Sequence, residues 1–109
     1  MPIEANGHGG LALQYLIGNK EDVIGSVKFD CFTDFVLVHS TLYFPTKTNL
    51  KLLKTEGNKL VNTILKDTMG YKQMWCYTPK PKLAKQLWKD FIVFAEYDNG
   101  FTLFFANLE

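Results

Sequence analysis

The sequence has 109 residues, of which 47% are hydrophobic and 15% aromatic, which indicates one domain with a packed core and excludes intrinsic disorder. Its formal net charge is +1, so the bulk charge gives no attraction to nucleic acid or to an anionic membrane. All 12 basic side chains are lysine, and without arginine the chain lacks the side chain best suited to bidentate phosphate or guanine contacts.

The N-terminal stretch MPIEANGHGG (residues 1–10) does not contain the basic region and apolar run of a secretory signal peptide. No window elsewhere approaches the roughly 20 apolar residues of a membrane-spanning helix. We therefore expect a flexible N-terminus, with His8 among mobile glycines, and a soluble cytoplasmic protein with no membrane partner.

Three segments then show the two-residue period of β-strands. They are LALQYLI (residues 11–17), VIGSVKFDCF (23–32) and FVLVHSTLYF (35–44). The turn-forming stretch GNKED predicts a hairpin between the first two. The third segment has apolar residues on both faces, which is typical of a central strand.

A long helix is predicted after the third strand. Pro45 ends the strand because it lacks the N–H that a ladder needs, and Thr46, Thr48 and Asn49 can each cap a helix start. Apolar residues at three- and four-residue steps extend the predicted helix through residues 51–67.

Two glycines in this region have predicted roles. Gly57 lies close to the apolar stripe of the helix, and we interpret it as a close approach between the helix and the sheet. Gly70 is placed for a left-handed cap. The next strand is YKQMWCY, residues 71–77.

The C-terminal third predicts a second helix and a hairpin. Pro81 suits the first turn of the helix. Its apolar stripe consists of Leu83, Ala84, Leu87, Trp88 and Phe91. Strands at 92–97 and 101–106 follow, with Asn99–Gly100 predicting a type I′ turn. The order β-β-β-α-β-α-β-β predicts an α+β (mixed α/β) fold, a mostly antiparallel sheet with helices packed on it.

From about residue 11 to the end, this pattern resembles the GNAT N-acetyltransferase superfold, in particular the small GNAT-like proteins of tailed phages. VLVHSTLYFP resembles the central strand of that fold, TKTNLK its loop and KLLKTEGNKLVNTILKD its helix. YKQMWCYTP resembles the next strand, which splays away so that acetyl-CoA can lie between the two strands. KLAKQLWKDFIVF resembles the segment that leads from the last helix into a closing strand.

Two departures from the family pattern argue against catalysis. GNAT enzymes hold the pyrophosphate on bare backbone N–H groups of a glycine-rich loop at a helix start. Here Thr48, Asn49, Leu50 and Lys51 occupy that loop, and no glycine occurs between Pro45 and Gly57. Residues 1–10 also leave no room for the family's first strand and acceptor-site helices. We therefore expect a non-catalytic GNAT-like module without a cofactor, a structural, assembly or host-interference factor of the host cytoplasm or the virion.

The alternative is a minimal acetyl-CoA-dependent N-acetyltransferase acting on a protein or a small amine. Its cofactor-binding residues would be Phe44, Thr46, Lys47, Thr48 and Asn49, which combine a helix N-terminus with hydroxyls and an ammonium group. The catalytic base would be His39 or a chain of waters, because an imidazole can accept a proton near working pH. The simpler interpretations are an ordinary helix cap and a satisfied core histidine.

Other reactive side chains have structural explanations. We expect Tyr77, Glu96 and Tyr97 to be rim residues that keep their polar ends in water. Cys31 and Cys76 lie in separate apolar runs without metal-ligand spacing, so we expect buried free thiols and no metal site.

The expected partner is a protein. We expect Trp75, Trp88 and the Phe-rich C-terminal hairpin to be mostly core, but the short N-terminal region should leave part of one sheet face uncovered. Exposed apolar area of that kind marks a contact with another chain, most simply in a homodimer. The helix lysines form a shallow patch with Lys80, Lys82, Lys85 and Lys89. This patch suits an acidic protein partner or a cofactor, and nucleic-acid binding is a third hypothesis.

Overall fold

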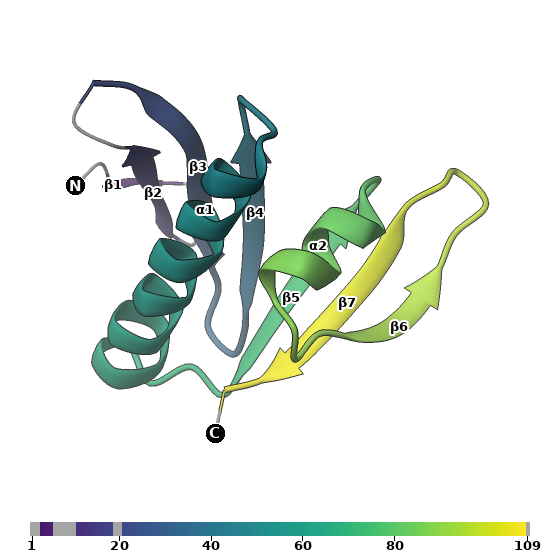
Figure 1. Cartoon of the computed structure of the whole chain (residues 1–109). Helices are drawn as coiled ribbons and strands as arrows, with labels where there is room; N and C mark the ends of the chain where they lie inside the picture. Colours follow the sequence, from purple (N-terminus) through teal and green to yellow (C-terminus); the bar gives the residue numbers. More distant parts are fainter. Residues whose placement is uncertain (1–2, 6–10, 19–20, 109) are drawn as a thin grey trace.

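The computed structural model describes residues 3–5, 11–18 and 21–108. Over these ranges the chain forms strands, two α-helices and one π-helical segment (Figure 1). They are β1 (Ile3–Ala5), β2 (Leu11–Gly18), β3 (Val23–Cys31), β4 (Val36–Leu42), α1 (Lys47–Leu60), η1 (Val61–Thr68), β5 (Gln73–Thr78), α2 (Pro81–Leu87), β6 (Ile92–Glu96) and β7 (Thr102–Asn107).

The strands form one 7-stranded sheet in the order β1-β2-β3-β4-β5-β7-β6. Neighbouring strands are antiparallel except for the parallel pair β4–β5. The predicted α+β fold is confirmed, and so is the central place of β4. The short strand β1 was not predicted, because its 3 residues are too few to show a period. The expectations for the rest of the N-terminus, including His8, concern residues outside the described ones.

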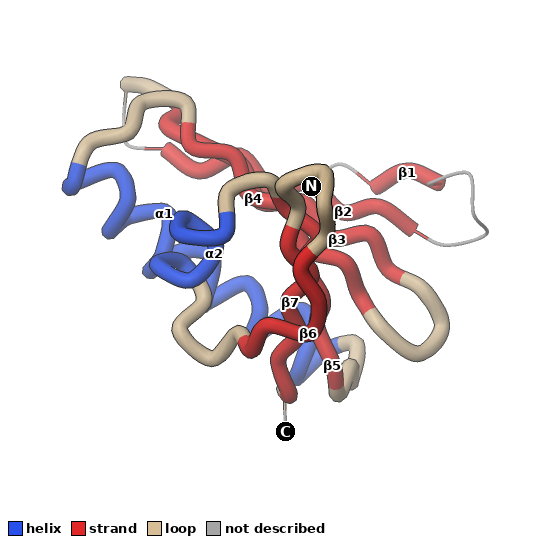
Figure 2. The backbone as a smooth tube through the Cα atoms, turned by 90° about the vertical axis from the view of Figure 1, so that its right-hand side faces the viewer, coloured by secondary structure: helices blue, strands red, loops and turns tan. Residues whose placement is uncertain are grey.

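Both helices pack on one face of the sheet, and the core lies between them and the strands (Figures 1 and 2). The largest fully buried side chains are Phe29, Phe91, Phe104, Leu53, Leu65, Leu87, Val27, Val36 and Val38. No helix of the described part of the chain covers the other face, which we call the open face. Its β2–β4 half carries the cross-strand neighbours Gln14, Lys28 and His39, and its β5–β7 half carries Trp75 and Phe105.

The long helix begins earlier than predicted and changes geometry halfway. The Thr46 hydroxyl caps α1 by accepting the Asn49 N–H at 3.1 Å. From Val61 the helix is π-helical, and near its end the Met69 N–H donates to the Ile64 carbonyl at 2.8 Å, five residues back. Gly70 has φ 74°, which confirms the predicted left-handed cap.

The second helix is shorter than predicted, because α2 ends at Leu87. Trp88 and Phe91 lie beyond its end and are still buried, at 3% and 1% exposure. Trp88 packs on α1, where a Cβ built on Gly57 would lie 2.8 Å from the Trp88 Cη2. The close approach predicted at Gly57 therefore exists, but its partner is this tryptophan and not the sheet.

The predicted type I′ turn between β6 and β7 is wrong. A type I′ turn needs positive φ at both central residues. Gly100 has φ 86°, whereas no described non-glycine residue, Asn99 included, has positive φ. The Tyr97 carbonyl accepts the Gly100 N–H at 3.1 Å and the Tyr97 N–H donates to the Phe101 carbonyl at 2.9 Å. The connection is a three-residue loop that ends in a left-handed glycine.

Candidate functional site

Strands β4 and β5 diverge, as the resemblance implied. They pair only at Val36–Met74 and Leu37–Trp75, although β4 continues to Leu42 and β5 to Thr78. The diverging ends leave a cavity of about 40 Å³ between β4, β5 and α2. Its wall consists of Ser40, Cys76, Thr78, Lys80, Leu83, Ala84, Leu87 and Trp88. A space of this size has room for a few water molecules, and Leu83, Ala84 and Leu87 of α2 form part of its wall.

Ser40 supplies a buried polar atom to the wall of this cavity. Its Oγ is buried and makes no hydrogen bond to any described residue. Buried hydroxyls are normally satisfied, so the Ser40 Oγ is a place where water or a ligand atom would bind. Sequence reasoning did not single out Ser40. The available signal was a small polar residue between Val38 and Leu42 on the buried side of the strand.

In the loop that the enzyme alternative assigns to the cofactor, Thr46 caps the helix. Thr46 caps the Asn49 N–H, and the Asn49 Nδ2 donates to the Phe44 carbonyl at 2.9 Å. The side chains of Phe44, Thr46, Lys47 and Thr48 are all exposed. The Thr46 hydroxyl thus satisfies one N–H group of the helix start, and the Asn49 amide is bonded to a carbonyl that precedes the helix.

The structure does not bring His39 to the cavity. His39 lies on the open face, whereas Ser40, the next residue, lines the cavity. The His39 ring is 44% exposed, and its Nε2 lies 2.8 Å from Asp30 Oδ2. The Lys28 Nζ lies 3.9 Å from the other Asp30 oxygen. The interpretation of His39 as a core histidine is therefore wrong, since it belongs to an exposed polar cluster.

Both cysteines are free and buried, as predicted. Burial raises the pKa of the Cys76 thiol to about 12 and is also the main cause of the raised pKa of Cys31. A thiol in such surroundings stays protonated and is a poor nucleophile. Within the described part of the chain, no group of three or more His, Cys, Asp or Glu side chains could hold a metal ion.

Aromatic side chains cover the β5–β7 half of the open face. Trp75 packs against Phe94 and Phe105 at ring distances of 5.1 and 5.2 Å. Tyr77 packs against Tyr97 and Phe101 at 5.6 and 4.7 Å. We call these six residues the aromatic face. Phe94 is 61% exposed, and Tyr77 and Tyr97 are 40% and 47% exposed, as expected for rim residues.

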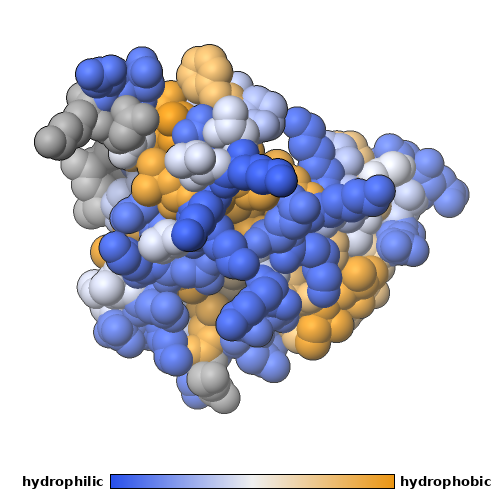
Figure 3. All heavy atoms as spheres, viewed as in Figure 1, coloured by the Kyte–Doolittle hydropathy of each residue, from blue (hydrophilic) through white to orange (hydrophobic). Residues whose placement is uncertain are grey.

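The apolar surface continues onto the edge strand β6, which has a neighbour only in β7. Ile92 and Val93 are 55% and 47% exposed. In the view from the helix side, hydrophobic atoms gather where β6 lies, whereas the surface over α1 is hydrophilic (Figure 3). A sheet face without a covering helix is thus present among the described residues, and its exposed aromatic part lies in the C-terminal half. Trp88 is core as expected, while Trp75 is only partly buried.

No family model matches the sequence, and no curated protein matches it. Solved structures match its fold. A domain from Methanocaldococcus jannaschii has a TM-score of 0.69 at 16% identity, over 89% of this chain and 67% of that one. Mutant forms of the spermidine/spermine N-acetyltransferase SpeG from Vibrio cholerae have a TM-score of 0.63 at 10% identity, over 88% of this chain and 64% of theirs.

An acetyltransferase from Bacillus cereus has a TM-score of 0.61 at 12% identity, over 98% of this chain and 75% of that one. Identities this low carry information on the fold alone. The fold of this chain is GNAT-like. None of the helices in the described part of the chain is long and apolar enough to cross a membrane.

Proposed function

We propose that this chain is a non-catalytic GNAT-like module that acts through protein–protein contact. The observation that carries the proposal is the aromatic face, which lies uncovered beside an edge strand with exposed Ile92 and Val93. Large exposed apolar patches on soluble proteins are usually interaction sites. The resemblance to small phage proteins makes a structural, assembly or host-interference role the expected class of activity.

Three features of the GNAT-like cleft support a role without catalysis. The cavity between β4 and β5 is about 40 Å³, far below the roughly 300 Å³ at which ligand pockets begin. The Thr46 hydroxyl already accepts one N–H of the helix start that would bind a pyrophosphate. The histidine that could act as a base lies on the other face of the sheet. Each feature bears on a different requirement of acetyl transfer, namely space, phosphate binding and a base.

A second copy of this chain is the partner that best fits the aromatic face. An edge strand such as β6 can pair with its own copy across a two-fold axis, since each copy presents the same unpaired N–H and C=O groups. The flanking rings of Phe94 and Tyr97 would then be covered by the same residues of the other copy. Side-chain burial and backbone pairing would act together at one interface.

Sedimentation analysis over a range of protein concentrations tests this proposal. We expect a concentration-dependent dimer that Phe94→Glu converts to a monomer, because a carboxylate would be buried at the interface. Leu16→Glu is a matched control, since Leu16 is 63% exposed on the β2–β4 half of the open face and Phe94 is 61% exposed. A monomeric wild type, or equal loss of dimer in both variants, would contradict self-association.

The alternative, a minimal acetyl-CoA-dependent N-acetyltransferase, is favoured by the divergence of β4 and β5 and by the unsatisfied Ser40 hydroxyl. It requires α2 to move outward so that the cavity becomes large enough for the coenzyme. Calorimetry with acetyl-CoA distinguishes the two proposals. Binding that weakens in Lys47→Glu would favour the enzyme, and no heat at high ligand concentration would favour the non-catalytic module.

A further inference from the structure

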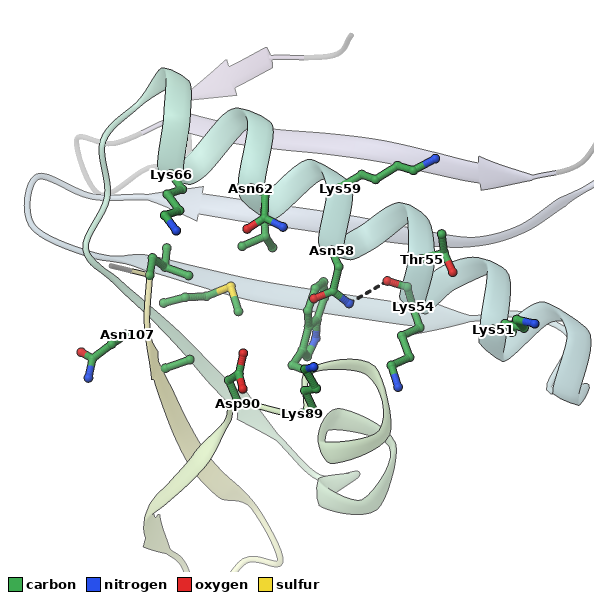
Figure 4. Close-up of a pocket in the computed structure, with 15 residues that line it drawn as sticks. Lys51, Lys54, Thr55, Asn58, Lys59, Asn62, Lys66, Lys89, Asp90 and Asn107 are labelled. Atoms are coloured by element: carbon green, nitrogen blue, oxygen red, sulfur yellow. Dashed lines mark hydrogen bonds between the residues drawn. The ribbon is translucent and has the colours of Figure 1, made fainter.

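The helix side of the molecule has a second concave region, which is separate from the cleft and from the aromatic face. It is a groove of about 720 Å³ between the α1–η1 helix, the loop after α2 and the end of β7 (Figure 4). Trp88 lines both this groove and the small cavity. The groove volume lies in the range of small-molecule sites. We call this region the lysine groove, after Lys51, Lys54, Lys59, Lys66 and Lys89 in its lining.

The charge of the lysine groove is largely uncompensated. Lys59 points away from the groove and lies 3.4 Å from Glu56 (Figure 4). The other four lysines make no ion pair with any described residue, and the lining contains a single acid, Asp90. Lys54 and Lys66 extend from the helix toward the side that carries Lys89 and Asp90 (Figure 4). Cations that repel one another across a concave surface attract a multivalent anion.

The π-helical segment η1 forms one wall of this groove. It contributes Asn62 and Lys66, which both line the groove. Its wider turns leave backbone groups of the preceding turn without their α-helical partners, and the Thr63 hydroxyl donates to the Lys59 carbonyl there. π-Helical segments are rare and occur often at functional sites. The irregular geometry therefore coincides with the charged wall of the groove.

We infer that the lysine groove binds a small sugar or polyol that carries several phosphates. Lysine ammonium groups are point-charge phosphate ligands, and the Asn62 amide adds neutral donors. Asp90 would repel a bare polyphosphate, but its carboxylate can accept a hydrogen bond from a hydroxyl group. The combination of several cations with one acceptor thus favours phosphates on a hydroxylated carrier.

Larger polyanions fit this groove less well. Single-stranded nucleic acid is bound on exposed aromatic rings, whereas Trp88, the aromatic residue of the lining, is 3% exposed. The chain also has no arginine to read bases or to clamp phosphates in pairs. Acidic peptide motifs are typically recognised by clusters of arginine, and this chain has none.

Titration calorimetry at low salt, with inositol hexakisphosphate as the probe, tests the inference. The variant Lys54→Ala/Lys66→Ala removes two exposed groove lysines without touching the core. We expect its dissociation constant to rise at least about tenfold. The matched control Lys80→Ala/Lys82→Ala loses the same charge outside the groove, and we expect a change below about twofold.

Substitution of Asp90 gives a second test, and its expected result differs from that of a general effect of charge. Asp90→Asn should tighten the binding of inorganic tripolyphosphate, which has no hydroxyl donor, more than that of inositol hexakisphosphate or a nucleoside triphosphate without metal. Three outcomes would overturn the inference: no heat with either organic phosphate, equal weakening in the groove and control variants, or tighter binding of an oligonucleotide or a poly-glutamate peptide. The lysine groove lies apart from β6, so none of these outcomes depends on self-association.

Discussion

The open face has two halves, which belong to one sheet but differ in the chemistry of their side chains. On the β2–β4 half, the side chains of Lys28, Asp30 and His39 lie on neighbouring strands and pair with one another. On the β5–β7 half, Trp75 and its neighbours form contacts between rings. The charged side chains of the first half pair with one another, whereas the second half exposes a group of aromatic rings.

This difference shows that two parts of a sheet face without a covering helix can have different roles in one protein. A polar uncovered face is ordinary solvent-facing sheet. An aromatic uncovered face still exposes apolar area to water. Burying that area against another chain would stabilise the complex by on the order of 25 cal/mol per Å². The following predictions test whether the two halves differ in energy as well as in composition.

The largest effect is expected at Trp75. Removing its ring in Trp75→Ala deletes both the Phe94 and the Phe105 contacts, and we expect a loss of about 2 kcal/mol in the free energy of unfolding, less than for a fully buried Trp. Urea denaturation measures this loss. Thr41→Ala, an exposed position of the β2–β4 half, is the control and should change stability by less than about 0.5 kcal/mol. Similar losses in both variants would mean that the halves are energetically alike.

A smaller effect is expected at the polar cluster. The His39–Asp30 pair is short, at 2.8 Å, but the histidine side chain is 44% exposed. Exposed pairs contribute little because solvent screens them. A double-mutant cycle with His39→Gln and Asp30→Asn should give a coupling energy below about 1 kcal/mol. A coupling of about 3 kcal/mol would instead indicate a tightly desolvated pair and a functional role for the β2–β4 half.

The smallest effect, no change in thiol labelling when the protein becomes monomeric, is expected at Cys76. This residue is on the helix side of β5 between Trp75 and Tyr77. At pH 8 a thiol reagent should leave Cys76 unmodified in the folded protein and modify it in urea, whether or not Phe94→Glu has made the protein monomeric. Rapid labelling of the monomeric variant alone would show that the aromatic face shields the core as well.

The same thiol predicts a dependence of stability on pH. Burial raises its folded pKa to about 12, above the value of roughly 8.5 for a free thiol. The contribution of Cys76 is therefore fully present below pH 8.5 and decreases as pH rises toward 12, because only the unfolded chain ionises in that window. Relative to Cys76→Ala, the wild type should lose stability across this range, as thermal unfolding at several alkaline pH values would measure.

Much of the fold could be predicted because its strands show a two-residue period and are separated by turn-forming residues. The period-two patterns of residues 11–17 and 35–44 lie in β2 and β4, and Gly70 has the predicted left-handed backbone. The errors lie where tertiary contacts override local patterns. Trp88 and Phe91 continue the helical stripe of α2 in sequence, but the chain leaves the helix at Leu87. The apolar pattern of a sequence does not by itself distinguish a helix from a buried loop.

The candidate site was harder to predict than the fold. Thr46 and Asn49 carry the same polar groups whether they bind phosphate or cap a helix, and only the geometry shows the cap. His39 follows the apolar run FVLV (residues 35–38) in sequence, and only the register places Lys28 directly opposite and brings Asp30 within hydrogen-bonding distance. For the lysine groove, the sequence predicted only a shallow patch of lysines, because the walls of the groove come from segments far apart in the chain.

The contact between Trp88 and Gly57 has a practical consequence for studies in solution. The chain has two tryptophans in different environments. Trp88 is buried against α1, whereas Trp75 is partly exposed on the open face. Indole emission shifts to longer wavelength when water reaches the ring. In Trp75→Phe, the remaining fluorescence would report whether α2 swings away from α1. In Trp88→Phe, it would report what covers the sheet, so each variant gives one optical signal for one event.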